Sequence, residues 1–144
     1  MPPLLEARHI RKVFRGGGQL FGGQASETVA CDDFSLLIDA DNPTFTTIAG
    51  ESGSGKTTIA RMLLGVLDPS AGQVLYRGRD VNELEKEGQR AFRKDVQAIF
   101  QDPFEVYNPF YKIDHILTTP IQKFGLAASK AEAYDQIHQA LRTV

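Results

Sequence analysis

The sequence has one cysteine, almost no net charge and no long apolar run, and each shortage excludes a class of protein. The single Cys31 excludes an internal disulfide and is typical of a reducing compartment. Sixteen basic and eighteen acidic residues leave a formal charge of -2, so bulk electrostatics give no argument for nucleic-acid binding. The richest apolar stretch, Ile59 to Leu67, is too short to cross a bilayer. The first residues lack the basic and apolar regions of a secretory signal. We therefore expect a soluble intracellular chain that reaches a membrane only through a partner.

The rest of the composition is that of an ordinary globular chain. Among 144 residues, 42% are hydrophobic and 24% are charged, which indicates one domain or a piece of one. Apolar alternation and β-branched runs predict strands at Leu5–Ile10, Phe34–Ile38, Thr44–Ala49, Gln73–Tyr76 and Asp95–Phe100. Helical spacing predicts helices at Lys56–Leu67, Val81–Phe92, Ile113–Phe124 and Ser129–Val144, the last opened by Ser129 and Glu132 at capping-box spacing. A β-rich front, a strand-loop-helix core and a helical rear make an α/β domain.

The strongest motif is Gly50-Glu51-Ser52-Gly53-Ser54-Gly55-Lys56-Thr57, which matches the Gly-x4-Gly-Lys-[Ser/Thr] pattern of a phosphate loop. Glycines let the backbone turn its N–H groups toward a polyphosphate, and the following helix adds its positive N-terminal end. We expect Lys56 to reach the β- and γ-phosphates and the Thr57 hydroxyl to hold Mg²⁺. An accidental match would arise in roughly one chain of this length in a few hundred, and the predicted flanking strand and helix lower that further.

Three segments together resemble the cassette ATPases of ABC transporters. They are the phosphate loop continued to Thr58, the run Asp68-Pro69-Ser70-Ala71-Gly72-Gln73-Val74, and the run Ile99-Phe100-Gln101-Asp102-Pro103-Phe104. Glu51, Glu105, Asn108-Pro109 and the long glycine loop after Phe14 look most like the dipeptide and oligopeptide importer branch. The resemblance implies a P-loop NTPase core with an N-terminal antiparallel β subdomain and the start of a helical subdomain.

The same resemblance assigns further roles. Gln101 matches the Q-loop glutamine, which contacts Mg²⁺ or the attacking water, and an amide oxygen suits that task. Phe14 matches the aromatic of the A-loop, which stacks on adenine, and phenylalanine is an acceptable replacement for tyrosine there. Thr58 matches a hydroxyl near the α-phosphate. By motif, the chain divides into a β-rich front (1–49), the Walker A loop and helix (50–67), the core to the Q-loop (68–102) and a partial helical subdomain (103–144).

Other residues that echo functional motifs are set aside. Hydrolysis in the family needs a Walker B aspartate with a following glutamate, a signature motif and a switch histidine, and all of these lie beyond the part that this sequence matches. Gly17-Gly18-Gln19 and Gly22-Gly23-Gln24 echo the signature but precede the phosphate loop, as does the run ending at Asp39 that echoes Walker B. The three histidines, His9, His115 and His138, have no metal-ligand spacing.

Two hypotheses from different classes remain. The first is an energy-coupling ATPase subunit on the inner face of the cell membrane, paired with a second cassette and with permease subunits, and served indirectly by a solute-binding protein. Peptide is the first candidate for the transported solute, and oligosaccharide and nickel are the alternatives. The second is a nucleotide-binding module without turnover, if no Walker B or signature follows. A small kinase or GTPase is a weaker reading because no Asn-Lys-x-Asp motif is present, and cassette proteins of DNA repair or translation stay open.

Overall fold

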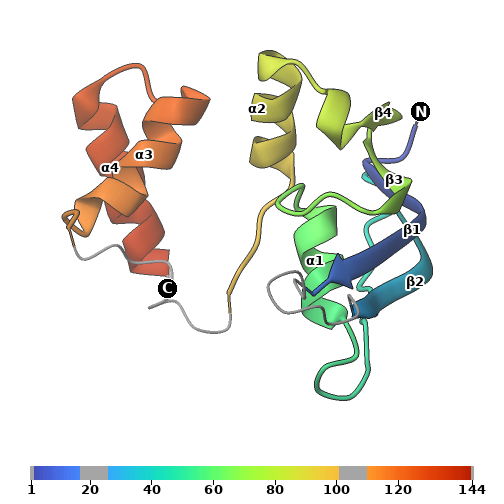
Figure 1. The fold of residues 1–144 in the computed structure, drawn as a ribbon. Coiled ribbons are helices and arrows are strands. Elements are labelled where there is room, and N and C mark those ends of the chain that lie inside the picture. The colour runs from blue at the N-terminus through green and yellow to red at the C-terminus, as the bar shows by residue number, and fades with distance from the viewer. Residues whose placement is uncertain (1, 17–25, 101–109, 144) are drawn as a thin grey trace. The chain divides into compact units, whose positions relative to one another are not determined.

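The computed structural model describes residues 2–16, 26–100 and 110–143, and it divides the chain into two compact units (Figure 1). The first unit is Met1–Val96 and the second is Gln97–Val144. These two units do not test the four-part division by motif, which stays a prediction.

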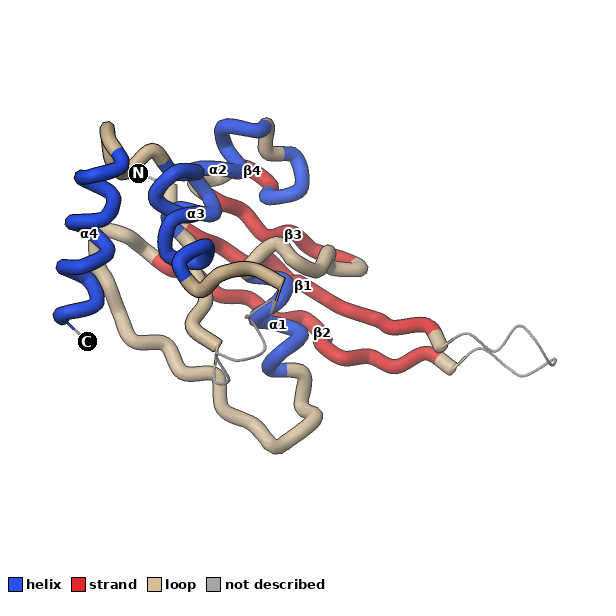
Figure 2. Tube along the Cα trace, turned by 90° about the vertical axis from the view of Figure 1, so that its left-hand side faces the viewer, coloured by secondary structure: helices blue, strands red, loops and turns tan. Residues whose placement is uncertain are grey.

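The first unit is built on an antiparallel sheet. Its strands are β1 (Leu5–Arg15), β2 (Glu27–Ile38), β3 (Ala71–Tyr76) and the short β4 (Arg79–Asp80), in the order β2-β1-β3-β4 (Figure 2). Each neighbouring pair runs antiparallel, with Leu5 opposite Ile38 on one side and Tyr76 on the other. The predicted strands at the start of the chain are confirmed, but both are longer than expected, because β1 and β2 stay paired as far as Arg15 and Glu27.

The pairing of β1 with β2 shifts register at three points that the sequence did not reveal, and the third is a bulge on β2. Lys12 lies opposite Cys31 and Val13 lies opposite Val29, so Ala30 is an extra residue on β2. A bulge of this kind bends its strand and changes the direction of the neighbouring groups, and bulges are over-represented next to functional sites.

Helix α1 (Lys56–Leu63) packs on this hairpin, which it contacts at both β1 and β2. It buries Ile59 and Met62, which are three residues apart and therefore on one helix face. Helix α1 ends at Leu63, so the predicted end at Leu67 is wrong. The reason is Gly65, whose left-handed backbone (φ 62°) closes the helix while the Val66 N–H donates to the Arg61 carbonyl at 3.0 Å.

The predicted helix over Val81–Phe92 is confirmed only from Lys86 onward: the segment forms a short 3₁₀ turn, η1 (Val81–Glu83), and then α2 (Lys86–Asp95). Asp80 caps the turn by accepting from the Asn82 N–H at 2.9 Å, and the backbone is then extended at Leu84. That break lets Val81 and Leu84 both bury their side chains in the core. Phe92 of α2 packs edge-on against Tyr76, with ring centroids 5.4 Å apart.

Two predicted strands are absent. Residues 44–49 form no strand, and the Phe45 side chain is fully exposed. Asp95 ends α2, and residues 97–100 are irregular, with Ile99 fully exposed. Both runs have the β-branched and apolar composition of buried strands, but a strand needs hydrogen-bonding neighbours. In the described part of the chain, neither run is paired with another strand.

In its described residues, the second unit has two contacting helices, α3 (Asp114–Phe124) and α4 (Lys130–Thr143), close to their predicted ranges. Gly125 ends α3 in left-handed geometry (φ 64°), with the Leu126 N–H donating to the Ile121 carbonyl at 2.9 Å. The Ser129 half of the predicted capping box at the start of α4 is confirmed, whereas the Glu132 carboxylate bonds to Ala128, one residue before the cap. The Glu132 N–H donates to Ser129 Oγ at 3.2 Å, and Glu132 Oε2 accepts from the Ala128 N–H at 2.7 Å.

Candidate functional site

The glycine loop before α1 turns through two residues in left-handed geometry. Gly53 has φ 83° and Gly55 has φ 92°, a region that costs residues with a Cβ about 1–2 kcal/mol. Between them, the Ser54 N–H donates to the Glu51 carbonyl at 3.2 Å and closes a turn. At the loop's start, a Cβ on Gly50 would lie 2.5 Å from Ser54 Oγ, so only glycine fits there without movement. The backbone therefore requires glycine at Gly53 and Gly55, whereas the close contact at Gly50 is with the rotatable Ser54 hydroxyl.

The Lys56 side chain folds back over the loop from the first residue of α1. Its ammonium donates to the carbonyl oxygens of Gly50 (2.7 Å) and Glu51 (2.5 Å) and lies 3.3 Å from Ser54 Oγ. These contacts hold a positive charge inside the turn of the loop. They also satisfy two carbonyl oxygens whose partial negative charge would repel an anion.

The first turn of α1 has no side-chain cap. Gly55 occupies the cap position and supplies no side-chain hydrogen bond. The N–H groups of Lys56, Thr57 and Thr58 have no acceptor within the helix, because the first turn of any α-helix lacks one. No acidic side chain lies in that turn. Such a helix start combines unpaired donors with the positive end of the helix dipole, and its chemistry fits an anion.

Gly55 also fixes the loop to the sheet. A Cβ on Gly55 would overlap the carbonyl oxygen of Ala30 and lie 3.2 Å from its carbonyl carbon. Ala30 is the bulged residue of β2, so the bulge and the loop meet at this point. The sequence contains no signal for this contact, because a bulge depends on pairing that a single strand does not record.

The strand register brings Phe14 to the same end of the hairpin. Phe14 pairs with Thr28, two residues along β2 from Ala30. Its side chain is 44% exposed, which leaves part of the ring surface open to a ligand. Phe14 therefore lies on the same hairpin as Ala30, whose carbonyl group is closely approached by Gly55. Lys12, also on β1, was not anticipated, although strand alternation puts it on the same face as Phe14.

The Mg²⁺-binding residues expected from the motif are described only in part. Thr57 is exposed in the first turn of α1, and Thr58 is half-buried beside it. A hydroxyl in that position is a chemically suitable oxygen ligand for Mg²⁺. Gln101, the second expected ligand, lies outside the described residues.

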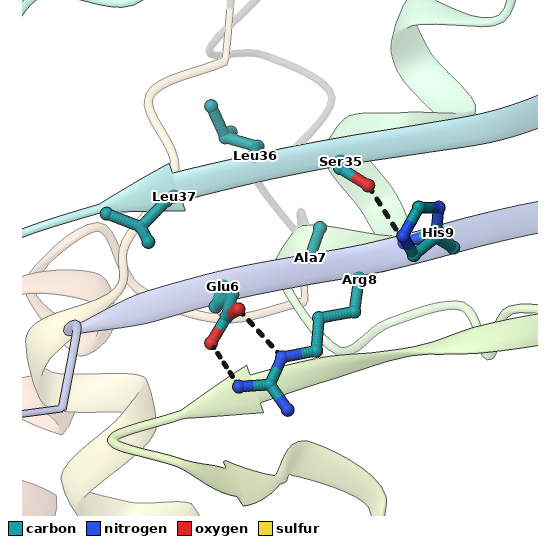
Figure 3. Close-up of a pocket in the computed structure, with 7 residues that line it drawn as sticks. All are labelled: Glu6, Ala7, Arg8, His9, Ser35, Leu36 and Leu37. Carbon is teal, nitrogen blue, oxygen red and sulfur yellow. Dashed lines mark hydrogen bonds and ion pairs between the residues drawn. The ribbon is translucent and has the colours of Figure 1, made fainter.

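A separate hollow of about 490 Å³ lies along β1 and β2 and involves none of the loop residues (Figure 3). Its polar groups already have partners. Arg8 donates to the Glu6 carboxylate through Nε (2.7 Å) and Nη2 (2.9 Å), and these bonds lower the pKa of Glu6. The His9 N–H donates to Ser35 Oγ at 3.0 Å. The wide opening and internal pairing give no reason to place the nucleotide there.

Cys31 offers no reactive thiol. It is buried in the core, its Sγ donates to the Ile10 carbonyl at 3.6 Å, and burial raises its pKa above the ordinary value. Its role is packing. None of the helices in the described residues has the length and apolarity needed to cross a membrane.

Comparison with known proteins agrees with this geometry. Residues 33–144 match the family model described as ABC transporter. The chain is 32% identical over all its length to the di/tripeptide transport ATP-binding protein DppF of Pseudomonas aeruginosa, and 30% identical over 98% of its length to the nickel import ATP-binding protein NikE of Escherichia coli. It spans 43% and 51% of those two relatives.

A solved structure shares the fold. It is an ATP-binding cassette seen as a dimer in a post-hydrolysis state with ADP and phosphate, matched with a TM-score of 0.74 at 23% identity over 96% of this chain and 56% of that one. The fold is therefore part of the α/β P-loop cassette, with its antiparallel β subdomain and helices. With a family model matching well over half of the sequence, the chain belongs to the ABC transporter family, among the ATP-binding subunits.

Proposed function

We propose that the loop Gly50–Thr58 binds the phosphates of ATP. The observation that carries the proposal is the start of α1, which opens from a left-handed glycine without a side-chain cap and has the Lys56 ammonium within the loop. The amides of the first turn would donate to phosphate oxygens, and Lys56 would exchange its loop oxygens for those of the β- and γ-phosphates. Thr57, with Gln101, would hold Mg²⁺, which supplies charge neutralisation at the phosphates.

Phe14 supports the proposal from the other end of the nucleotide. An exposed ring on the hairpin that contacts Gly55 offers a stacking surface for adenine. The ligand would then be held by charge at its phosphates and by an apolar contact at its base.

Calorimetry on the full chain with two ligands separates these roles. ATP has both phosphates and a base, whereas tripolyphosphate has phosphates alone. We expect Lys56→Ala to weaken both ligands at least tenfold, because it removes a charge-assisted contact worth about 1.5–3 kcal/mol. Phe14→Ala should weaken ATP alone. Unchanged ATP affinity in Lys56→Ala would refute the phosphate site, and equal losses for both ligands in Phe14→Ala would make that ring structural.

We further propose that the chain works as the energy-coupling subunit of an importer, cytoplasmic and peripheral at the membrane. Family membership and the names of its relatives support this role. A second cassette and permease subunits would be its direct partners, and a solute-binding protein an indirect one. The relatives are named for peptide and for nickel. We propose peptide because the motif resemblance favours that branch, and because a relative named as a probable peptide transporter subunit is 39% identical over 66% of this chain, against 30% for the nickel protein.

Uptake measurements test the solute. Cells whose chain carries Lys56→Ala should lose import of a labelled dipeptide and keep import of nickel, as measured against the unaltered strain. Loss of nickel import with normal dipeptide import would contradict the peptide assignment.

A further inference from the structure

Phe14 has a cation on one side of its ring. The ammonium of Lys12 lies 5.5 Å from the ring centroid, within the range of a cation–π contact. The two residues are two apart on β1, so their side chains leave the same face of the strand. The exposed surface of Phe14 remains available beside this contact.

The ammonium is itself held in place. Lys12 Nζ donates to the carbonyl oxygen of Asp68 at 2.7 Å, in the loop that follows α1. That loop is tied to β1 by two further bonds, from the Ser70 N–H to the Arg11 carbonyl (2.7 Å) and from the Val13 N–H to Ser70 Oγ (3.1 Å). The hydrogen bond to Asp68 therefore restricts the motion of the Lys12 side chain, which in most exposed lysines is unrestrained.

Lys12 also differs from the other cations at this end of β1. Arg11 pairs with Asp32 at 3.1 Å, and Arg15 pairs with Glu27 at 2.9 Å. Within the described ranges, the partners of the Lys12 ammonium are a neutral carbonyl and an aromatic ring, with no carboxylate among them. Its charge is thus directed at Phe14 without neutralisation by an ion pair.

We propose that Lys12 is a positioning residue for the base of the nucleotide and acts through the Phe14 ring. The claim rests on the proposed stacking role of Phe14. A cation at one face draws π-electron density toward itself, which favours stacking of an electron-rich purine on the ring. The same contact limits rotation of the ring, so less freedom is lost when the base binds.

A double-mutant cycle on the full chain tests this inference with ATP and tripolyphosphate as ligands. Lys12→Met removes the charge and keeps the apolar stem. We expect it to weaken ATP about two- to fivefold, the size of an exposed cation–π contact, and to leave tripolyphosphate unchanged. In a Phe14→Ala background the same change should have no effect on ATP. Lys12→Arg keeps a cation and should bind ATP within about twofold of the unaltered chain.

Arg11→Met is the matched control, because it removes one charge from the neighbouring residue on the opposite face of β1. It should leave the ratio of ATP to tripolyphosphate affinity unchanged, and thermal unfolding of each variant checks that it is folded. If Lys12→Met unfolds, Lys12→Gln, a neutral side chain with an N–H donor for the Asp68 carbonyl, takes its place.

The outcomes separate the two claims. Equal loss of ATP and tripolyphosphate in Lys12→Met would place Lys12 on the phosphates and overturn the inference. The same loss of ATP affinity with and without Phe14 would show that Lys12 does not act through the ring, while leaving the stacking role intact. Unchanged ATP affinity in Phe14→Ala alone would remove the stacking role, and the inference with it.

Discussion

Replacing Gly55 with alanine should destabilise the chain more than the same change at Gly53. Both glycines have left-handed backbones, at φ 92° and 83°, so alanine is strained at either by about 1–2 kcal/mol. Gly53 has open space around its missing Cβ, whereas a Cβ on Gly55 would overlap the Ala30 carbonyl oxygen. That oxygen belongs to the backbone of a paired strand and does not move aside as a flexible side chain does. Overpacking of this kind costs about 1–3 kcal/mol more.

The expected totals are therefore about 2–5 kcal/mol for Gly55→Ala and about 1–2 kcal/mol for Gly53→Ala. Urea denaturation of the full chain measures both free energies of unfolding, and Gly53→Ala is the matched control for backbone strain. ATP titrations of the folded variants then report whether the loop keeps its shape. Equal destabilisation by the two substitutions would refute the close packing of the loop on the β2 bulge.

Two further predictions concern residues away from the loop. Asp95 accepts hydrogen bonds from Tyr76 Oη (2.6 Å) and Arg77 Nη2 (3.0 Å), and these bonds lower its pKa below the ordinary 3.8. A lowered folded-state pKa stabilises the fold above the unfolded value and loses that contribution as pH falls through the folded one. Denaturation midpoints should thus fall more steeply below about pH 4 in the unaltered chain than in Asp95→Asn, and parallel curves would contradict the assignment. Ser129→Ala should cost α4 about 1 kcal/mol by removing the acceptor of the Glu132 N–H, measured as faster amide exchange in the first turn of α4. Unchanged exchange there would contradict the capping role of Ser129.

The phosphate loop could be predicted from the sequence because its requirements are local. Spaced glycines, a lysine and a hydroxyl residue describe a backbone path and a donor set that need no distant partner. The cap that Ser129 provides to the Glu132 N–H was predictable for the same reason. The end of α1 had a local signal too, since Gly65 is the residue type that closes helices in left-handed geometry.

The missed features depend on pairing between distant segments. Residues 44–49 have the composition of a buried strand, yet composition does not reveal whether neighbouring strands are present to bond with them. The bulge at Ala30 and its contact with Gly55 arise only once β1 and β2 are in register. The Lys12 contact with Phe14 was predictable in part, because alternation along one strand already puts the two side chains on one face.

The most direct test of the central claim is amide hydrogen exchange across the full chain with and without Mg-ATP. We predict that ATP slows exchange in the peptide covering Gly53 to Thr58, where the first-turn N–H groups of α1 would gain phosphate acceptors, and that Lys56→Ala abolishes this protection. Exchange in α4 should not change in its Ser129 to Thr143 segment. Protection by ATP elsewhere with none at residues 53–58 would contradict the claim that this loop is the nucleotide site.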